Sequence, residues 1–179
     1  MRVNWKTYNS GKFYDEIISS PGYARKPARG LASYLRSLTH EELLQKKTAA
    51  ELAIKTMGIS FTVYSDGENI DREWPFDIIP RVIAEKEWNH TSLGLKQRLR
   101  ALNCFIHDVY NDQKIFKDKL IPKELILNSG NFRKECVGIK PRFDTWAHIC
   151  GTDLIRDHTG EFFVLEDNLR GPSGVSSML

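Results

Sequence analysis

The sequence predicts an α+β fold, in which a helical N-terminal half packs on a mostly antiparallel sheet. Apolar residues recur at spacings of three and four in residues 31–57 and 92–110, which is the period of an α-helix. Residues 59–63 instead alternate apolar and polar side chains, as a half-buried strand does. Short apolar runs around the turn residues 157–160 favour paired strands in the last third of the chain.

Two segments of different character are expected. Residues 1–27 mix Tyr, Gly, Ser and Pro, and breakers such as Pro21 and Pro27 favour a loosely ordered arm with a short helix around residues 13–18. Residues 28–179 contain no repeat, low-complexity tract or linker that would divide them. We therefore expect an arm followed by one domain.

Local signals place the ends of the helices. Thr39 is followed three residues later by Glu42, the pattern of a capping box, so a helix is expected to begin there. Gly58 stands where that helix would end. A shorter helix is expected to begin at Pro122, a favoured first helical residue, and to end before Gly130.

Four segments read as strands. The first is residues 59–64, and residues 65–68 then form a turn. The other three are residues 145–150, 153–156 and 161–166. The last two would form a hairpin.

The composition is that of a globular protein. Hydrophobic residues make up 41% of the 179 and charged residues 27%, which argues against wholesale disorder. The net charge of +3, without a dense Lys/Arg run, permits anionic ligands but predicts no nucleic acid. No membrane span and no apolar signal core are present, so the cytoplasm is the expected location.

The sequence argues against several common kinds of metal and catalytic site. The three cysteines form no CxxC pair and are expected to be reduced thiols rather than zinc ligands. The histidines have no metal-ligand spacing, and there is neither a Ser–His–Asp arrangement nor a P-loop. The cysteines are Cys104, Cys136 and Cys150.

The hairpin carries three oxygen-bearing side chains. Glu166 and Asn168 are two residues apart, so they share a face in an extended strand. If the turn has a two-residue loop, Asp153 opposes Val164 and lies diagonal to Glu166 on that face; a three-residue loop would break this register. Three hard oxygen ligands suit Mg²⁺. The alternative is that these are ordinary solvated acidic side chains.

Groups that bind anions follow the hairpin. Arg170 is two residues beyond Asn168 and could bind a phosphate as a bidentate donor. Residues 171–174 form an exposed turn whose backbone N–H groups could approach an anion. Upstream, Arg98 and Arg100 are expected on a solvated helix face rather than in contact with a ligand.

Four segments carry a resemblance to a known family. GTDLIRDHTGEFFVLEDNLRGPSGVS resembles the metal-binding end of ATP-grasp enzymes, in which an Asp on one strand is followed by a strand ending in Glu-x-Asn. Together with ISFTVYSDGE, WPFDIIPRVI and GLKQRLRALNCFIHDVYNDQKI, it resembles the bacterial circularly permuted ATP-grasp family related to glutathionylspermidine synthase. The resemblance covers roughly residues 30–178 and implies the front portion of such a domain.

The resemblance implies an ATP- and Mg²⁺-dependent carboxylate–amine ligase. Such enzymes phosphorylate a carboxylate, and an amine then displaces the phosphate to form an amide. Two basic residues, Arg170 and Arg81, would be catalytic, and Arg170 would hold the transferring phosphate. Glu166 would be the ligand that bridges two ions. The metal ligands would be Asp153, Glu166 and Asn168, and the cofactor-binding residues Arg170, Ser173 and Gly174.

Two departures from the family's pattern qualify this function. Family members continue well beyond PSGVSY, whereas this sequence ends at Leu179, so the part expected to clamp the nucleotide would be missing. Gly151 stands where many ATP-grasp proteins outside the permuted group have Arg. The chain is therefore expected to be inactive alone and to need a companion chain.

Other readings stay open. The chain could be a non-catalytic binding or regulatory module, or a truncated gene product that retains the fold. Apolar surface left uncovered by a missing part would also favour a homo-oligomer. The substrate would be a small molecule or a peptide.

Overall fold

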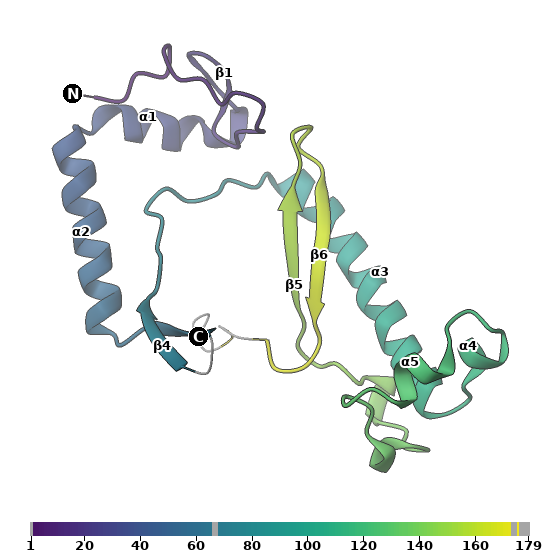
Figure 1. Ribbon diagram of the computed structural model, residues 1–179. Coiled ribbons are helices and arrows are strands. Elements are labelled where there is room, and N and C mark those ends of the chain that lie inside the picture. Colours follow the sequence, from purple (N-terminus) through teal and green to yellow (C-terminus); the bar gives the residue numbers. More distant parts are fainter. Residues whose placement is uncertain (1, 66–67, 173–174, 176–179) are drawn as a thin grey trace. The chain divides into compact units, whose positions relative to one another are not determined.

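The computed structural model describes residues 2–65, 68–172 and 175, with the side chains of residues 61–73 left aside. The chain divides into two compact units, Met1–Ala84 and Glu85–Leu179. Helices and two-stranded antiparallel sheets make up both units (Figure 1), which confirms the α+β class. The described strands pair as three separate hairpins rather than as one sheet.

The first unit begins with a small hairpin. Strands β1 (Ile18–Ser20) and β2 (Tyr23–Ala24) pair antiparallel. The helix expected around residues 13–18 is not formed. The carboxylate of Asp15 accepts the backbone N–H groups of Ile17 and Ile18 at 2.7 and 2.6 Å, and this local turn replaces helical hydrogen bonds.

Two helices follow in this unit. The 3-10 turn η1 (Lys26–Ala28) leads into α1 (Arg29–Ser37), whose inward stripe supplies Ala32 and Leu35 to the core. Among the described side chains of the unit, the buried apolar ones lie mostly in α1 or next to it: Ile18, Ala28, Ala32, Leu35 and Leu38.

Helix α2 (His40–Thr56) has the N-terminus that its sequence predicts. Thr39 Oγ1 accepts the N–H of Glu42 at 3.2 Å, and the Glu42 carboxylate accepts the N–H of Thr39 at 2.7 Å. At the other end, Gly58 has a φ of 70°, and its N–H donates to Lys55. Both expected ends of this helix are confirmed.

Strands β3 (Ser60–Ser65) and β4 (Glu68–Glu73) form the second hairpin, so the strand expected at residues 59–64 is confirmed. The turn expected at residues 65–68 includes residues 66 and 67, which lie outside the described residues. Residues 74–80 form no helix or strand, and the Asp77 carboxylate accepts the N–H of Ile79 at 2.9 Å.

The second unit is organised by one long helix, α3 (Glu85–Tyr110), which begins seven residues before the stretch predicted from periodicity. Short helices α4 (Lys114–Lys117) and α5 (Lys123–Leu127) follow, and Pro122 is the N-cap of α5 rather than its first residue. The connection to the last hairpin contains the 3-10 turns η2 (Lys134–Cys136) and η3 (Arg142–Asp144).

The prediction of a strand at residues 145–150 is wrong. The N–H groups of Trp146 and Ala147 both donate to the side-chain oxygen of Asn103 on α3, at 2.7 and 3.0 Å. Backbone donors that a strand would present to a neighbour are thus satisfied by a helix side chain. Trp146 also stacks on Tyr110, with ring centroids 5.0 Å apart, which holds the segment against α3.

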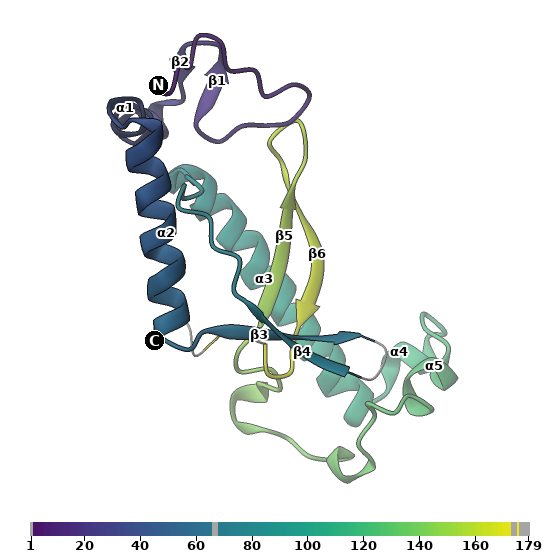
Figure 2. The same ribbon diagram turned by 60° about the vertical axis from the view of Figure 1, so that its left-hand side comes forward.

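The last hairpin, β5 (Gly151–Arg156) and β6 (Phe162–Asn168), lies along α3 in both views (Figures 1 and 2). In the described part of the chain, Cys104, Cys136 and Cys150 are all unpaired thiols, as expected. No helix among the described residues is both long and apolar enough to cross a membrane.

Candidate metal site on the last hairpin

The turn of the β5–β6 hairpin has three loop residues, not two. Asp157 donates its N–H to the carbonyl of Glu161 at 3.0 Å, and Gly160 takes the positive φ of 97° that such a loop requires. The Asp157 carboxylate accepts the N–H and the hydroxyl of Thr159 and the N–H of Glu161. These hydrogen bonds, led by that from the Thr159 side chain, hold the pKa of Asp157 below its ordinary value.

A β-bulge corrects the register that the longer loop would otherwise shift. Near the turn, Leu154 pairs with Val164, and beyond the irregularity Asp153 pairs with Glu166, so Leu165 is the extra residue. The pairing of Asp153 with Val164, which depended on a two-residue loop, is therefore not formed. The three-residue loop shifts β6 by one residue and the bulge by one more, and the two shifts together return Glu166 to the face of Asp153.

We call the hairpin face turned away from α3 the outer face. Asp153 and Glu166 are cross-strand neighbours there, and Asn168, two residues along β6, is opposite Gly151. All three side chains are exposed. Asn168 donates from Nδ2 to Glu166 Oε1 at 2.9 Å, which leaves its own Oδ1 available as an acceptor. The structure thus brings together the three residues expected to bind metal.

The donor set fits a hard divalent cation that keeps several waters. It offers two carboxylates and one amide oxygen, and Mg²⁺ is typically held by one or two carboxylates with water and phosphate oxygens completing the shell. Within the described residues, no group of three or more His, Cys, Asp or Glu side chains could hold a metal. The three oxygen donors of the outer face do not form such a group, because only Asp153 and Glu166 are acidic and the third donor is Asn168.

Arg170 follows β6 by two residues and is exposed. Among the described residues, no hydrogen bond or ion pair engages its guanidinium. Ser173 and Gly174, the other residues expected to contact a nucleotide, lie outside the described residues.

Gly151 has a steric role that its sequence did not reveal. A Cβ at this position would lie 2.8 Å from the Cβ of Pro172 and 3.7 Å from that of Asn168. Because the chain after β6 folds back over β5 here, a residue with a side chain would displace it. At this position, where many ATP-grasp proteins outside the permuted group have Arg, the backbone of this chain is covered too closely for a side chain.

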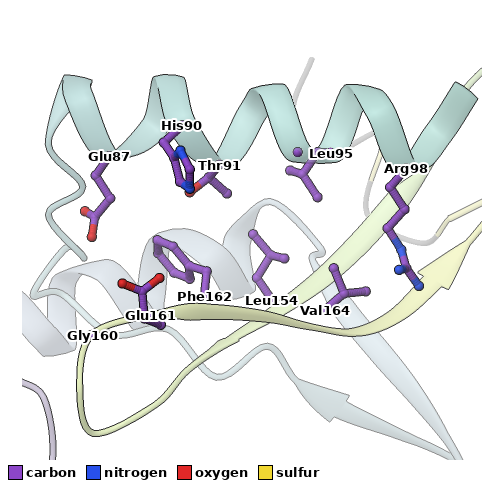
Figure 3. Close-up of a pocket in the computed structure, with 11 residues that line it drawn as sticks. Glu87, His90, Thr91, Leu95, Arg98, Leu154, Gly160, Glu161, Phe162 and Val164 are labelled. Atoms are coloured by element: carbon purple, nitrogen blue, oxygen red, sulfur yellow. The ribbon is translucent and has the colours of Figure 1, made fainter.

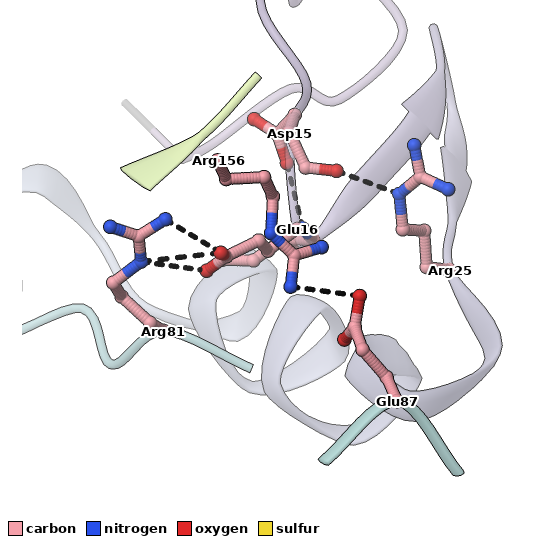
Figure 4. Close-up of polar contacts among 7 residues, drawn as sticks. Asp15, Glu16, Arg25, Arg81, Glu87 and Arg156 are labelled. Carbon is pink, nitrogen blue, oxygen red and sulfur yellow. Dashed lines mark hydrogen bonds and ion pairs between the residues drawn. The ribbon is translucent and has the colours of Figure 1, made fainter. Parts of the chain in front are cut away.

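The opposite, inner face of the hairpin packs on α3 and is held at two places. Arg156 pairs with Glu87 at 2.8 Å (Figure 4), and Arg98 pairs with Asp167 at 2.7 Å. Glu87 and Arg98 are eleven residues apart, or ~16 Å along the helix axis. The Arg156 side chain is only 3% exposed and lies over the Phe162 ring at 4.0 Å.

A pocket of about 280 Å³ lies between these two ion pairs (Figure 3). Leu95 of α3 and Leu154, Phe162 and Val164 of the hairpin give it an apolar lining, with His90 and Glu161 at one end. None of the three outer-face oxygen donors lines this pocket. The inner face therefore serves helix–hairpin packing, and the candidate metal ligands lie on the other side.

Arg81 belongs to the first unit, where its guanidinium binds Glu16 through two nitrogens (Figure 4). Its Nη2 lies 2.7 Å from Oε1 and its Nε 3.1 Å from Oε2. The hydrogen bond to Glu16 raises the pKa of Arg81 above its ordinary value. This contact ties residue 81 to residue 16, and the catalytic role expected for Arg81 stays a prediction.

Sequence reasoning missed the pairing of Arg98 with Asp167. Arg98 was expected on a solvated face, but its Nε donates to Asp167 Oδ2, and the Asp167 side chain is 7% exposed. A signal was present in the sequence. Asp167 stands between two residues assigned to one face of a strand, so it must point to the other face, where a buried carboxylate needs a cation.

Known proteins resemble this chain over nearly its whole length. An uncharacterized protein of Synechocystis sp. is 47% identical over 174 residues, which is 97% of this chain and 36% of that protein. An uncharacterized protein of Mycobacterium tuberculosis is 39% identical over 176 residues, 96% of this chain and 31% of that protein. The chain thus spans about a third of the length of these relatives.

A more distant relative carries the name of an enzyme. A Frankia alni protein named "Putative glutamate--cysteine ligase 2-3" is 35% identical over 164 residues, 91% of this chain and 19% of that protein. Residues 80–179, which include α3 and the hairpin with its three oxygen donors, match the family described as circularly permuted ATP-grasp type 2. This match covers more than half of the sequence, and the chain belongs to the circularly permuted ATP-grasp type 2 family.

Proposed function

We propose that this chain supplies the metal-binding part of an ATP-dependent carboxylate–amine ligase. The observation that carries the proposal is the pairing of Asp153 with Glu166, with Asn168 beside them, inside the segment that matches the ATP-grasp family. The Frankia relative named as a glutamate–cysteine ligase supports amide-bond formation as the reaction class.

Each residue has a distinct task in this proposal. Asp153, Glu166 and Asn168 would hold Mg²⁺, with Glu166, which lies between the other two, bridging two ions. Bound there, Mg²⁺ would neutralise charge on the phosphates of ATP. Arg170 would hold the transferring phosphoryl group as a bidentate donor. The hairpin itself positions these side chains, because two strands fixed along α3 are a rigid support.

The reaction needs more than these 179 residues. The relatives are about three times longer, and we assign the groups that clamp the nucleotide to the remainder of such a protein or to a companion chain. Exposed apolar side chains beside the metal ligands support this, because a covering element would bury them. On the outer face, Ile155 is 50%, Phe163 53% and Leu165 65% exposed.

The substrate class follows from the reaction. A carboxylate and an amine of amino-acid or peptide type fit a ligase whose relative is named for glutamate and cysteine. A pair like that of glutathionylspermidine synthase, which the sequence resemblance implies, is one member of this class.

Thermal unfolding with and without millimolar Mg²⁺ and ATP tests the proposal, in the wild type and in Glu166→Gln. A ligand present at 100 times its dissociation constant stabilises the folded state by about 2.7 kcal/mol. We expect a Mg²⁺-dependent rise in the melting temperature that Glu166→Gln abolishes. Gln keeps the shape of the side chain, so the unliganded melting temperature should be the same.

The matched control is Glu161→Gln, an exposed acidic residue of the same hairpin that lies at its turn end. This variant should respond to Mg²⁺ and ATP as the wild type does. An equal shift in the wild type and in Glu166→Gln would remove Glu166 from the site. No shift in any of them would mean that this chain by itself holds no working nucleotide–metal site, which would favour a companion chain or a non-catalytic module.

A further inference from the structure

We propose that Asp167 is a positioning residue that locks the register of β6, so that Glu166 and Asn168 stay on the outer face. The inference rests on the proposed function, since it concerns the same metal site. Asp167 stands between the two β6 ligands and points the opposite way, toward α3. It would act through its neighbours and touch neither the metal nor a substrate.

Both carboxylate oxygens of Asp167 are engaged. Oδ2 accepts from Arg98 Nε at 2.7 Å, and Oδ1 accepts from Thr152 Oγ1 at 2.9 Å. Thr152 is the direct cross-strand partner of Asp167. One side chain therefore joins β6 to β5 and to α3 at the same point, one residue from each of the two β6 ligands.

The bulge at Leu165 makes such a lock necessary. If β6 paired without the bulge, Asp153 would oppose Leu165 and Thr152 would oppose Glu166. Glu166 and Asn168 would then face α3, and Asp167 would face solvent. The metal ligands would no longer share a face with Asp153.

Glu166 can compete with Asp167 for Arg98. If β6 paired without the bulge, the Glu166 carboxylate would take the place of Asp167 beside Thr152 and could pair with Arg98. In the wild type, Arg98 already has Asp167 as its partner on the inner face. In Asp167→Asn, Arg98 lacks a counter-charge, and the shift of β6 by one residue supplies one by moving Glu166 away from the metal site.

Mn²⁺ alone is the probe, added to the isotopically labelled full chain and followed by paramagnetic broadening in NMR spectra. In the wild type, Mn²⁺ should selectively broaden the amide signals of Asp153, Glu166 and Asn168. In Asp167→Asn the Mn²⁺ affinity should fall at least tenfold, as losses of outer-shell partners do. Backbone NOEs that pair Asp153 with Glu166 should weaken in parallel, which reports the register directly.

Two further variants separate positioning from stability. Val164→Ala removes apolar contacts from the same inner face and should keep the wild-type Mn²⁺ affinity. Arg98→Met combined with Asp167→Asn removes the unpaired cation and should regain affinity relative to Asp167→Asn alone. If Asp167→Asn does not fold, Thr152→Val, which removes only the hydrogen bond to Oδ1, should show a smaller loss of affinity and of the same NOEs.

The outcomes are distinguishable. Wild-type Mn²⁺ affinity and intact NOEs in Asp167→Asn would overturn the positioning role while leaving the metal site in place. A double variant that binds no better than Asp167→Asn would overturn the competition for Arg98, and the proposal with it. No selective broadening in the wild type would remove the metal site itself, and with it both proposals.

Discussion

Gly151 packs directly against Pro172: a Cβ on Gly151 would lie 2.8 Å from the Cβ of the proline ring. This contact joins the first residue of β5 to the chain that leaves β6. Gly151→Ala should therefore push the segment at Pro172 away from the hairpin and destabilise the fold by about 1 kcal/mol. Chemical-shift changes in NMR spectra should be confined to residues around Pro172 and Asn168.

Gly130→Ala is the control for this substitution. A Cβ on Gly130 would meet nothing within 4 Å, and its backbone has no positive φ. The variant should unfold at the same denaturant concentration as the wild type or slightly above it. Equal behaviour of the two alanine variants would contradict a steric role for Gly151.

The capping box of α2 should contribute measurably to stability. Thr39→Ala removes the hydroxyl that accepts the Glu42 N–H and should lower the free energy of unfolding by about 1 kcal/mol. Thr39→Ser retains the acceptor and should be close to the wild type. Urea denaturation followed by circular dichroism measures both. A Thr39→Ala variant as stable as Thr39→Ser would show that the reciprocal hydrogen bonds contribute nothing.

Asp15 should make the stability of the first unit depend on pH. Burial by itself would raise the pKa of Asp15, but hydrogen bonds from Tyr8 Oη and from the N–H groups of Ile17 and Ile18 outweigh it and lower the pKa. A carboxyl whose pKa is lowered by folding stabilises the folded state above its unfolded pKa of about 3.9. This contribution is lost as the pH falls through the folded value.

The measurement compares the wild type with Asp15→Asn across the acidic range. The variant should be about 1–2 kcal/mol less stable at pH 7, and the difference should shrink below about pH 4, where the carboxyl becomes protonated in the unfolded chain before it does in the folded one. Asp77→Asn, an exposed residue of the same unit that accepts the Ile79 N–H, is the control. A stability difference that stays constant from pH 7 to pH 2 would contradict the role of the charge.

The outer face should promote self-association of the chain. Ile155 and Phe163 are cross-strand partners, at least half exposed, and Leu165 extends the apolar surface. Light scattering at increasing concentration should show dimers or larger species, and Phe163→Ser with Leu165→Ser should shift the equilibrium toward monomer. A wild-type chain that stays monomeric at high concentration would refute the expected homo-oligomer.

Local signals in the sequence were enough for α2, for β3 and for the β5–β6 hairpin. The capping box at Thr39, the glycine at 58 and the strand alternation from residue 59 each act within a few residues, so they can be read along the chain. The same holds for the grouping of Glu166 with Asn168, since two residues of spacing define one face of a strand.

Tertiary structure decided what depends on contacts between distant residues. Residues 145–150 have the composition of a strand, yet Asn103, more than forty residues away, takes the hydrogen bonds of Trp146 and Ala147. Likewise, the sequence contains Asp167 and Arg98 but not their contact, because only the packing of β6 on α3 brings residues 69 positions apart together.

The register of the β5–β6 hairpin separates what the sequence predicts from what the tertiary structure decides. By itself, the sequence determined that the turn is at residues 157–160 and that Asp153, Glu166 and Asn168 are candidates for one site. The loop length moves every side chain of β6 to the other face, and the bulge at Leu165 moves those beyond it back; both were decided only in the folded chain. The physical reason is that a one-residue shift changes no local preference but changes every cross-strand contact.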